Sequence, residues 1–330
     1  MNVINANFTP VDQFTENDKW HELRKTGLGG SDAGAIMGLN KYSSPLNVYF
    51  QKKGVKGFEG NAATEWGHIL EDPIREKTRK ELNVYIQTVA GMYTSKEYPF
   101  MNANVDGLIV VPDGDSFVMN GENLTGIGIH EIKTSANGDG FKEDEIPDSY
   151  YCQVQHYMAV TQLDWAVLTV FILSKKQGKH YLIKRNDNFI LDLIKAEKDF
   201  WENYVEKEII PEPMGVDSEI DFIEKLPMAE EIILSTDLLP LIEEKERLSQ
   251  QEKEIKQEIE KIKNKLLLSF YDENSNGSKN TVATVGDYKL SYSTSVKKSV
   301  DTDLLKKDGL YENYLKTTET KTFRISKKRG

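Results

Sequence analysis

The sequence has a single cysteine, Cys152, among its 330 residues. One thiol permits no intrachain disulfide and no cysteine-based zinc or iron–sulfur site, which excludes the iron–sulfur class of nucleases. The chain also lacks any run of about 18 apolar residues, so we expect no transmembrane helix. Residues 1–9 show neither the basic nor the apolar segment of a secretion signal. We therefore expect a protein of a reducing cytoplasm.

Positive charge is scarce as well. The sequence has 42 Lys and Arg residues against 53 Asp and Glu residues, a net charge of −11. Proteins that bind nucleic acid usually show a basic footprint, so this balance argues mildly against DNA as a partner. Net charge describes the local field poorly, however, and an enzyme that binds metal through carboxylates can be acidic overall.

A nucleotide-binding phosphate loop is also missing. The glycine-rich residues 27–32 (GLGGSD) are not followed by Gly-Lys-Ser and do not have dinucleotide-binding spacing, which excludes a fused helicase. A glycine-rich turn that leads into a helix can still bind a DNA phosphate through backbone N–H groups. Arg24 and Ser31 would add side-chain donors there. The alternative is an ordinary helix-capping turn.

The hydrophobic pattern indicates a mixed fold. Short apolar runs between Gly, Pro and Asp predict strands over residues 83–90, 105–111, 117–119, 127–133, 165–173 and 180–185. Helical spacing and caps predict helices over residues 32–39, 45–54, 62–82, 149–161 and 187–208. Pro73 should kink the helix over 62–82. The fold class that follows is α/β (α+β), with a mixed sheet flanked by helices.

The composition changes around residues 211–227. Beyond that point Leu241, Leu248, Ile255 and Ile262 recur every seven residues. This spacing predicts one long helix over about 237–270, which packs on its own domain or on a short helical partner.

Three regions follow from this change. We expect a large domain over residues 1–215, a linker over 216–236, and a long helix with a small α+β accessory region over 237–330. The accessory region should contain a hairpin at 285–288, a helix near 303–315 and a final strand ending in a basic tail.

Two short apolar strands carry the residues with the clearest chemistry. Asp106 lies within residues 105–109 (VDGLI), and Glu131 and Lys133 lie within residues 130–134 (HEIKT). The two-residue period of a strand places Glu131 and Lys133 on one face. If the strand of Asp106 pairs beside them, two carboxylates and one ammonium group converge.

Such a set can hydrolyse a phosphodiester. Asp106 and Glu131 can hold Mg²⁺, or Mn²⁺ as a substitute, with the backbone carbonyl of Ile132 as a further ligand. The metal lowers the pKa of a bound water and stabilises the charge of the transition state. Lys133 would orient the attacking water or help to deprotonate it. A Glu-apolar-Lys triplet alone is more often the solvated face of an edge strand, so the assignment depends on further motifs.

Two helices add polar side chains. Glu71, in residues 66–71 (WGHILE), can supply a third carboxylate, whereas His68 on the same helix is better explained as structural. Gln153 and Tyr157 are four residues apart and share a helix face, from which they can position the metal's outer shell or a phosphate. The alternative for Glu71 is simple solvation, and the alternative for Gln153 and Tyr157 is the polar edge of an amphipathic helix.

Five motifs occur in one order along residues 20–210. They are an Arg before GLGGSD, then WGH…LE, NVDG, EIKT and QVQHY. This order resembles the YqaJ-type viral recombinase family, similar to phage lambda exonuclease, within the PD-(D/E)XK nuclease superfamily. The resemblance implies a restriction-endonuclease-like core and a magnesium-dependent exonuclease that digests the 5′ strand at double-stranded DNA ends and leaves 3′ overhangs. It also implies a ring-shaped homotrimer and a partner protein that anneals the remaining single strand in recombination.

The resemblance also implies roles for individual residues. Asp106, Glu131 and Lys133 match the catalytic set, and Glu71 matches an accessory acid. The implied ring would ease the charge problem, because Lys and Arg residues that line a channel can act locally. The resemblance does not reach residues 237–330 with comparable specificity.

The remaining matched residues are expected to bind phosphate or to support the catalytic residues. By resemblance, Arg24 and Ser31 bind phosphate at the 5′ end, and Gln153 with Tyr157 supports the catalytic site and its phosphate. Two alternative functions stay open: a structure-specific or sequence-specific endonuclease on the same core, and a DNA-binding recombination scaffold without turnover. A scaffold has no need of the complete catalytic set, which argues against the second.

Overall fold

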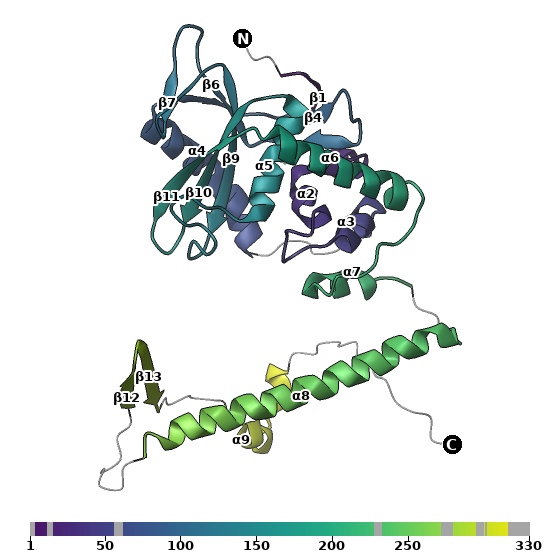
Figure 1. Ribbon diagram of the computed structural model, residues 1–330, viewed down its shortest axis with the longest axis vertical. Coiled ribbons are helices and arrows are strands. Elements are labelled where there is room, and N and C mark those ends of the chain that lie inside the picture. The colour runs from purple at the N-terminus through teal and green to yellow at the C-terminus, as the bar shows by residue number, and fades with distance from the viewer. Residues whose placement is uncertain are drawn as a thin grey trace. The chain divides into compact units, whose positions relative to one another are not determined.

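The computed structural model describes residues 4–11, 16–55, 62–227, 233–271, 280–294, 300 and 302–315. Contacts within the chain divide it into two units, Met1–Pro227 and Met228–Gly330 (Figure 1). The expected final strand and basic tail over residues 316–330 lie outside the described residues. Within the described ranges, no helix combines the length and the apolar character that a membrane span requires.

A five-stranded mixed sheet forms the centre of the first unit, in the order β11-β10-β9-β6-β3. The central strand β9 (Ile127–Ser135) pairs in parallel with β10 (Trp165–Ile172) and antiparallel with β6 (Gly107–Val110). The outer strands β11 (Gln177–Lys184) and β3 (Tyr85–Gln87) are antiparallel to their neighbours. The strand that carries Glu131 is thus enclosed on both edges, as a buried site requires.

Two long helices cover opposite faces of this sheet, α4 (Ala62–Leu82) and α5 (Asp148–Thr161). Glu131 of β9 reaches Gln153 of α5, whereas the neighbouring His130 bonds toward the α4 side. Successive side chains of a strand point to opposite faces, so one helix lies on each face (Figure 1). α5 also supplies the crossover that the parallel pair β9–β10 needs. The mixed sheet flanked by helices that the sequence predicts is therefore confirmed.

A smaller sheet packs beside the first, in the order β1-β4-β5-β2. Its strands are β1 (Ala6–Pro10), β4 (Gly91–Ser95), β5 (Met101–Ala103) and β2 (Leu28–Gly29). β2 and β5 are parallel, and Gly29 lies opposite Asn102. This pairing brings the glycine-rich segment beside the strand that leads to Asp106.

The other elements of the first unit surround these sheets. They are α1 (Asn17–Lys25), α2 (Gly30–Ile36), α3 (Pro45–Lys52), the hairpin of β7 (Phe117–Met119) and β8 (Glu122–Leu124), α6 (Asp187–Phe200) and the π-helical turn η1 (Trp201–Val205). Ser44 caps α3 and accepts the Asn47 N–H at 3.4 Å, as a Ser before Pro predicts. The helix expected over 187–208 is α-helical only to Phe200 and continues as η1.

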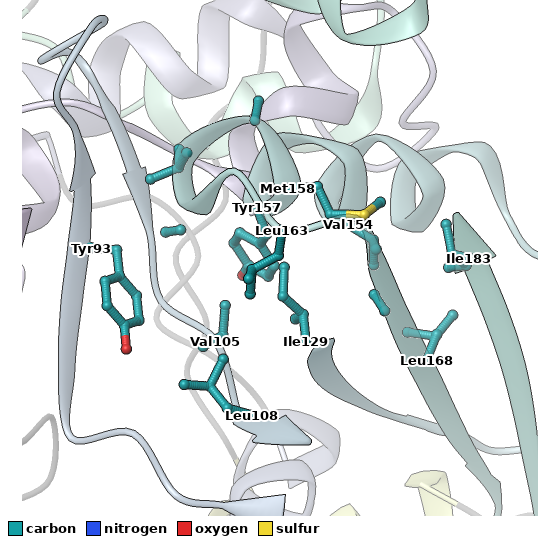
Figure 2. Packing of buried hydrophobic residues seen from close by; sticks show 14 of the residues in the cluster. Tyr93, Val105, Leu108, Ile129, Val154, Tyr157, Met158, Leu163, Leu168 and Ile183 are labelled. Atoms are coloured by element: carbon teal, nitrogen blue, oxygen red, sulfur yellow. The ribbon is translucent and has the colours of Figure 1, made fainter. Parts of the chain in front are cut away.

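The main hydrophobic core lies between α5 and the two sheets. Figure 2 shows Val154 and Met158 of α5 packed with Ile129 and Leu168 of the large sheet, all fully buried. Burial of one such side chain contributes about 1.5–3 kcal/mol. Because α5 is held by this packing, its polar face is fixed relative to β9.

Residues 217–223 differ from the sequence expectation. They lie in the expected linker, but they form η2 (Asp217–Glu219) and α7 (Ile220–Ile223) and pack within the first unit. Phe222 is buried against Phe50, with ring centroids 6.2 Å apart. Glu219 accepts a 2.5 Å hydrogen bond from the Ser44 hydroxyl. These partners are far away in the sequence, so local composition carried no sign of them.

The second unit is described by itself. It contains η3 (Thr236–Leu238), α8 (Leu239–Leu268), the hairpin of β12 (Asn280–Val285) and β13 (Tyr288–Ser293), α9 (Thr302–Lys307) and η4 (Tyr311–Tyr314). The long helix and the hairpin occur where the sequence predicts them. α8 has no buried residue, and its heptad positions are about half exposed or more, from 50% at Leu248 to 66% at Leu241.

A buried ion pair joins α2 to α3. Lys52 Nζ donates to Asp32 Oδ2 at 2.6 Å and to the Arg24 carbonyl at 2.9 Å, and both charged side chains are 4% exposed. Burial would raise the pKa of Asp32, but Lys52 and Arg24 outweigh it and lower that pKa. Asp32 is therefore charged although it is buried, and Lys52 compensates the cost of burying this charge.

Replacement of this lysine should destabilise the first unit. Lys52→Met leaves the Asp32 carboxylate buried without its main partner, which should lower the free energy of unfolding by about 3–5 kcal/mol. Urea unfolding can be followed by tryptophan fluorescence, because all four tryptophans lie in the first unit. The matched control is Lys53→Met, which removes an exposed pair with Glu208 and a long contact with the Tyr49 ring and should change little. Equal stability of the two variants would contradict this role of the pair.

Candidate active site

One cavity of about 350 Å³ collects every side chain that the sequence assigned to chemistry or phosphate. Its lining includes Arg24, Ser31, Glu71, Asp106, Glu131, Ile132, Lys133, Gln153 and Tyr157. These residues come from α1, α2, α4, α5, β9 and the segment before β6. Residues more than 130 positions apart in the chain thus share one site.

The register of β6 with β9 brings the carboxylates together. Gly107 lies opposite His130, so Asp106 comes level with Glu131. Asp106 Oδ2 accepts the backbone N–H of Ile132 at 2.7 Å. Lys133 Nζ donates to Glu131 Oε1 at 2.7 Å, as expected for two residues on one strand face.

The two oxygens of Glu131 have different surroundings. Oε1 accepts hydrogen bonds from Lys133 and, at 2.8 Å, from Gln153 Nε2. Oε2 is buried and has no hydrogen-bond partner. Burial of a carboxylate oxygen without a partner costs free energy, unless a cation compensates it. One oxygen of Glu131 therefore orients the group, and the other is left for a ligand.

Negative charge is concentrated around this oxygen. Burial and the neighbouring Asp106 raise the pKa of Glu131 to about 8. Burial also raises the pKa of Asp106, and burial and Asp106 together raise that of Glu71. Burial alone would lower the pKa of Lys133, but the attraction of Glu131 and Asp106 raises it, so Lys133 stays an ammonium group.

This donor set fits a hard divalent cation. Glu131 Oε2 and the Asp106 carboxylate are oxygen ligands, and the Ile132 carbonyl lies on the Asp106 side because the N–H and C=O of one strand residue point the same way. Across the described residues, no group of three His, Cys, Asp or Glu side chains forms a metal site. Water and phosphate oxygens would have to complete the coordination. Glu71 lines the cavity and is bound by His68 Nδ1 at 3.0 Å.

The glycine-rich segment forms another wall of the cavity. Arg24 donates to Ser31 Oγ at 2.9 Å, and its guanidinium lies 4.8 Å from the centre of the Trp20 ring. A Cβ atom at Gly30 would lie 2.5 Å from Cε1 of Tyr157. A glycine is therefore needed at position 30 for Tyr157 to reach the cavity.

Gln153 connects the catalytic strand to Tyr157. Its amide nitrogen donates to Glu131 Oε1 and to the Tyr157 hydroxyl, each at 2.8 Å. Burial raises the pKa of Tyr157 well above its usual value, so its hydroxyl stays protonated. The Tyr157 oxygen accepts from Gln153, which leaves its own hydrogen to donate into the cavity.

Several residues that line the cavity were not predicted from the sequence. Trp20, Asn102 and Asn104 line the cavity but were assigned no role. A signal was present: Asn102, Asn104 and Asp106 occupy every second position of residues 101–106 (MNANVD). That spacing is typical of side chains on one face of a strand.

The raised pKa of Glu131 should make the metal-free protein sensitive to pH. A folded-state pKa of about 8, against an ordinary 4.5, means that folding favours the protonated form. Its stabilising effect is complete below about pH 4.5 and is lost as the pH rises to about 8. Urea unfolding in EDTA should therefore show a wild type that loses stability over this range relative to Glu131→Gln.

Added Mg²⁺ provides the control for this measurement. It should restore stability at the upper pH in the wild type and leave Glu131→Gln unchanged, because the variant lacks the anionic ligand. A difference between the two proteins that does not vary with pH would contradict a buried, titrating Glu131.

Comparison with known proteins agrees with the motifs. Residues 19–164 match the model of the YqaJ-like viral recombinase domain. Over 324 residues, 93% of each chain, the sequence is 26% identical to the uncharacterized protein YqaJ of Bacillus subtilis (strain 168). A stretch of 56 residues, 17% of this chain and 16% of the other, is 38% identical to protein D345L of African swine fever virus.

Two solved structures are similar at lower identity. The alkaline exonuclease LHK-Exo from Laribacter hongkongensis is 20% identical, with 58% of this chain and 94% of that chain covered and a TM-score of 0.42. A phage-related exonuclease from Haemophilus somnus 129PT is 17% identical, with 58% and 98% covered and a TM-score of 0.39. The matched residues 19–164 include every predicted site residue from Arg24 to Tyr157. Residues 19–164 are therefore similar to the YqaJ-like viral recombinase domain, and the chain is similar to the Bacillus subtilis protein YqaJ over 93% of its length.

Proposed function

We propose that this chain is a Mg²⁺-dependent exonuclease that digests the 5′ strand at double-stranded DNA ends and leaves 3′ single-stranded overhangs. The observation that carries the proposal is the buried, unpartnered oxygen of Glu131 beside Asp106. It lies in a cavity that also contains Arg24 and Ser31. The viral recombinase family of the domain supports DNA as the substrate and recombination as the process served.

Asp106, Glu131 and the Ile132 carbonyl would hold the cation, for which Mn²⁺ can substitute. When bound, the cation supplies a Lewis acid that lowers the pKa of water and offsets the negative charge of the transition state. These three ligands would be completed by water and phosphate oxygens. Glu71 adds a third carboxyl group to the same cavity as an accessory acid.

The remaining side chains orient the reacting groups. Lys133 is an ammonium group, held by Glu131 at 2.7 Å, and its other N–H bonds can orient the attacking water and stabilise charge on the phosphate. Gln153 donates to the same oxygen of Glu131 as Lys133 and helps to hold the carboxylate in one position. The Tyr157 hydroxyl can donate to a phosphate oxygen.

The polarity of digestion follows from the second wall of the cavity. Arg24 and Ser31 can bind the terminal 5′ phosphate while the next phosphodiester lies at Asp106 and Glu131. A guanidinium suits this role because it binds phosphate oxygens through paired N–H groups. An end held in this way releases one nucleotide per cut.

The proposed assembly and partner follow from the family. We propose a homotrimer that encloses the DNA and a single-strand annealing protein that takes up the overhang. An enclosed channel would also reconcile DNA binding with a net charge of −11, because basic residues act locally within it.

End-labelled DNA tests the function directly. With Mg²⁺, a linear duplex labelled at its 5′ ends should release labelled mononucleotides before one labelled at its 3′ ends, and a closed circle should stay intact. Asp106→Ala should retain DNA binding and lose cleavage, because it removes a metal ligand and no phosphate contact. Cleavage by this variant would contradict the assignment.

The other outcomes of that experiment favour other functions. A nicked or linearised circle would favour an endonuclease on the same core. Binding without cleavage in Mg²⁺ or Mn²⁺ would favour a DNA-binding scaffold.

Recognition of the 5′ phosphate has its own test. Arg24→Ala should reduce the preference for 5′-phosphorylated over 5′-hydroxyl ends by about tenfold or more, since it removes a charge-assisted contact. The measurement is the initial rate of digestion on the two ends. The neighbouring Lys25 pairs with the exposed Glu22, and Lys25→Ala should leave the preference unchanged. A preference unaffected by Arg24→Ala would argue against this role.

A further inference from the structure

Asn102 has an unused donor in the wall of the cavity. Its side chain is 3% exposed, and Nδ2 is buried without a hydrogen-bond partner. It lines the same cavity as Arg24 and Ser31. We propose that Asn102 is a ligand of the terminal 5′ phosphate, an inference that rests on the proposed exonuclease function.

One end of the Asn102 side-chain amide contacts Thr94. Oδ1 accepts the Thr94 hydroxyl at 2.8 Å, so Nδ2 is the end left over. The Asn102 carbonyl accepts His156 Nε2 at 2.8 Å, and the strand pairs with Gly29 on one side and Thr94 on the other. The donor is therefore held by a rigid frame before any ligand binds, which reduces the entropic cost of binding.

Gly27 places this donor on the Arg24 side of the cavity. A Cβ atom at Gly27 would lie 2.5 Å from Asn102 Nδ2, so the amide nitrogen sits directly over the turn between α1 and β2. Arg24 is in the last turn of α1, and Ser31 follows β2. The scissile phosphate belongs at Asp106 and Glu131, whereas Asn102 belongs with the contacts of the terminal phosphate.

A second donor in the same cavity supports an anion as the ligand. The indole N–H of Trp20 is also buried without a partner, and Trp20 lies under the Arg24 guanidinium. The two residues with an unused N–H group thus line one cavity together with Arg24 and Ser31. Unpaired buried donors are rare in folded proteins, and a phosphate would satisfy them all as an acceptor of several hydrogen bonds.

Three substitutions separate this role from a structural one. Asn102→Leu removes the donor without adding charge, and Asn102→Asp keeps the Thr94 contact but places a carboxylate oxygen where the donor was. Trp20→Phe keeps an aromatic ring beside Arg24 and removes only the indole N–H. Binding of the full-length protein to a blunt duplex with 5′-phosphate or 5′-hydroxyl ends is measured by fluorescence anisotropy in metal-free buffer, so that nothing is cleaved.

We expect all three variants to lose preference for the 5′-phosphorylated end, and Asn102→Asp to lose the most. Asn102→Leu and Trp20→Phe should lower the ratio of affinities for phosphorylated and hydroxyl ends by about tenfold. Asn102→Asp should lower it by about a hundredfold, because like charge repels the phosphate. Affinity for the hydroxyl end should stay at the wild-type value in all three.

Three results would overturn the proposal. Wild-type preference in the Asn102 variants, beside a lost preference in Arg24→Ala, would leave the 5′-phosphate site intact and remove Asn102 from it. An equal loss on both ends would make Asn102 a structural residue. A wild type with no preference would instead refute 5′-phosphate recognition as a whole, while the end-label experiment would still decide whether the protein is an exonuclease.

Discussion

The pairing of β6 with β9 holds two buried carboxylates, Asp106 and Glu131, closer than their charges favour. Backbone hydrogen bonds and apolar packing supply the free energy that keeps them there, since the strands are enclosed by other strands and by α4 and α5. Burial raises the pKa of both groups, and the charge of Asp106 raises that of Glu131 further. One oxygen of Glu131 is left without a hydrogen-bond partner. Because the fold holds two buried carboxylates close together, a site for a cation is already formed before the cation binds.

The walls around this pair are fixed by contacts far from it. Lys52 neutralises Asp32 and holds the Arg24 carbonyl, so α3 positions the segment that carries the expected phosphate contacts. Gly30 allows α2 to approach α5, and Tyr157 reaches the cavity across that contact. The core packing of α5 and the buried ion pair thus position the walls of the cavity, in addition to stabilising the fold.

The acidic composition is compatible with this arrangement. Acidic side chains on one side of the cavity suit a cation, and Arg24, Ser31, Asn102 and Trp20 on the other suit a phosphate. A substrate that brings both its phosphates and the cation fits both sides at once. Net charge averages over such local contrasts, so −11 carries little information about them.

Local pattern in the sequence determined much of this protein. The strand period placed Glu131 and Lys133 on one face, Ser44 before Pro45 marked the start of α3, and the heptad spacing marked α8. The ordered motifs resemble the YqaJ-like viral recombinase domain, whose model matches residues 19–164. Each of these signals involves residues close together in the chain or a family pattern.

Only the tertiary structure decided which distant residues meet. It brought Asp106 level with Glu131, paired Lys52 with Asp32, buried Phe222 of an expected linker against Phe50, and left Asn102 Nδ2 unpaired in the cavity. Strand register and packing between distant elements determine these contacts, and a shift of one residue in register would turn every side chain of the strand to the other face. Local sequence does not encode that choice, because it results from the packing of the whole unit.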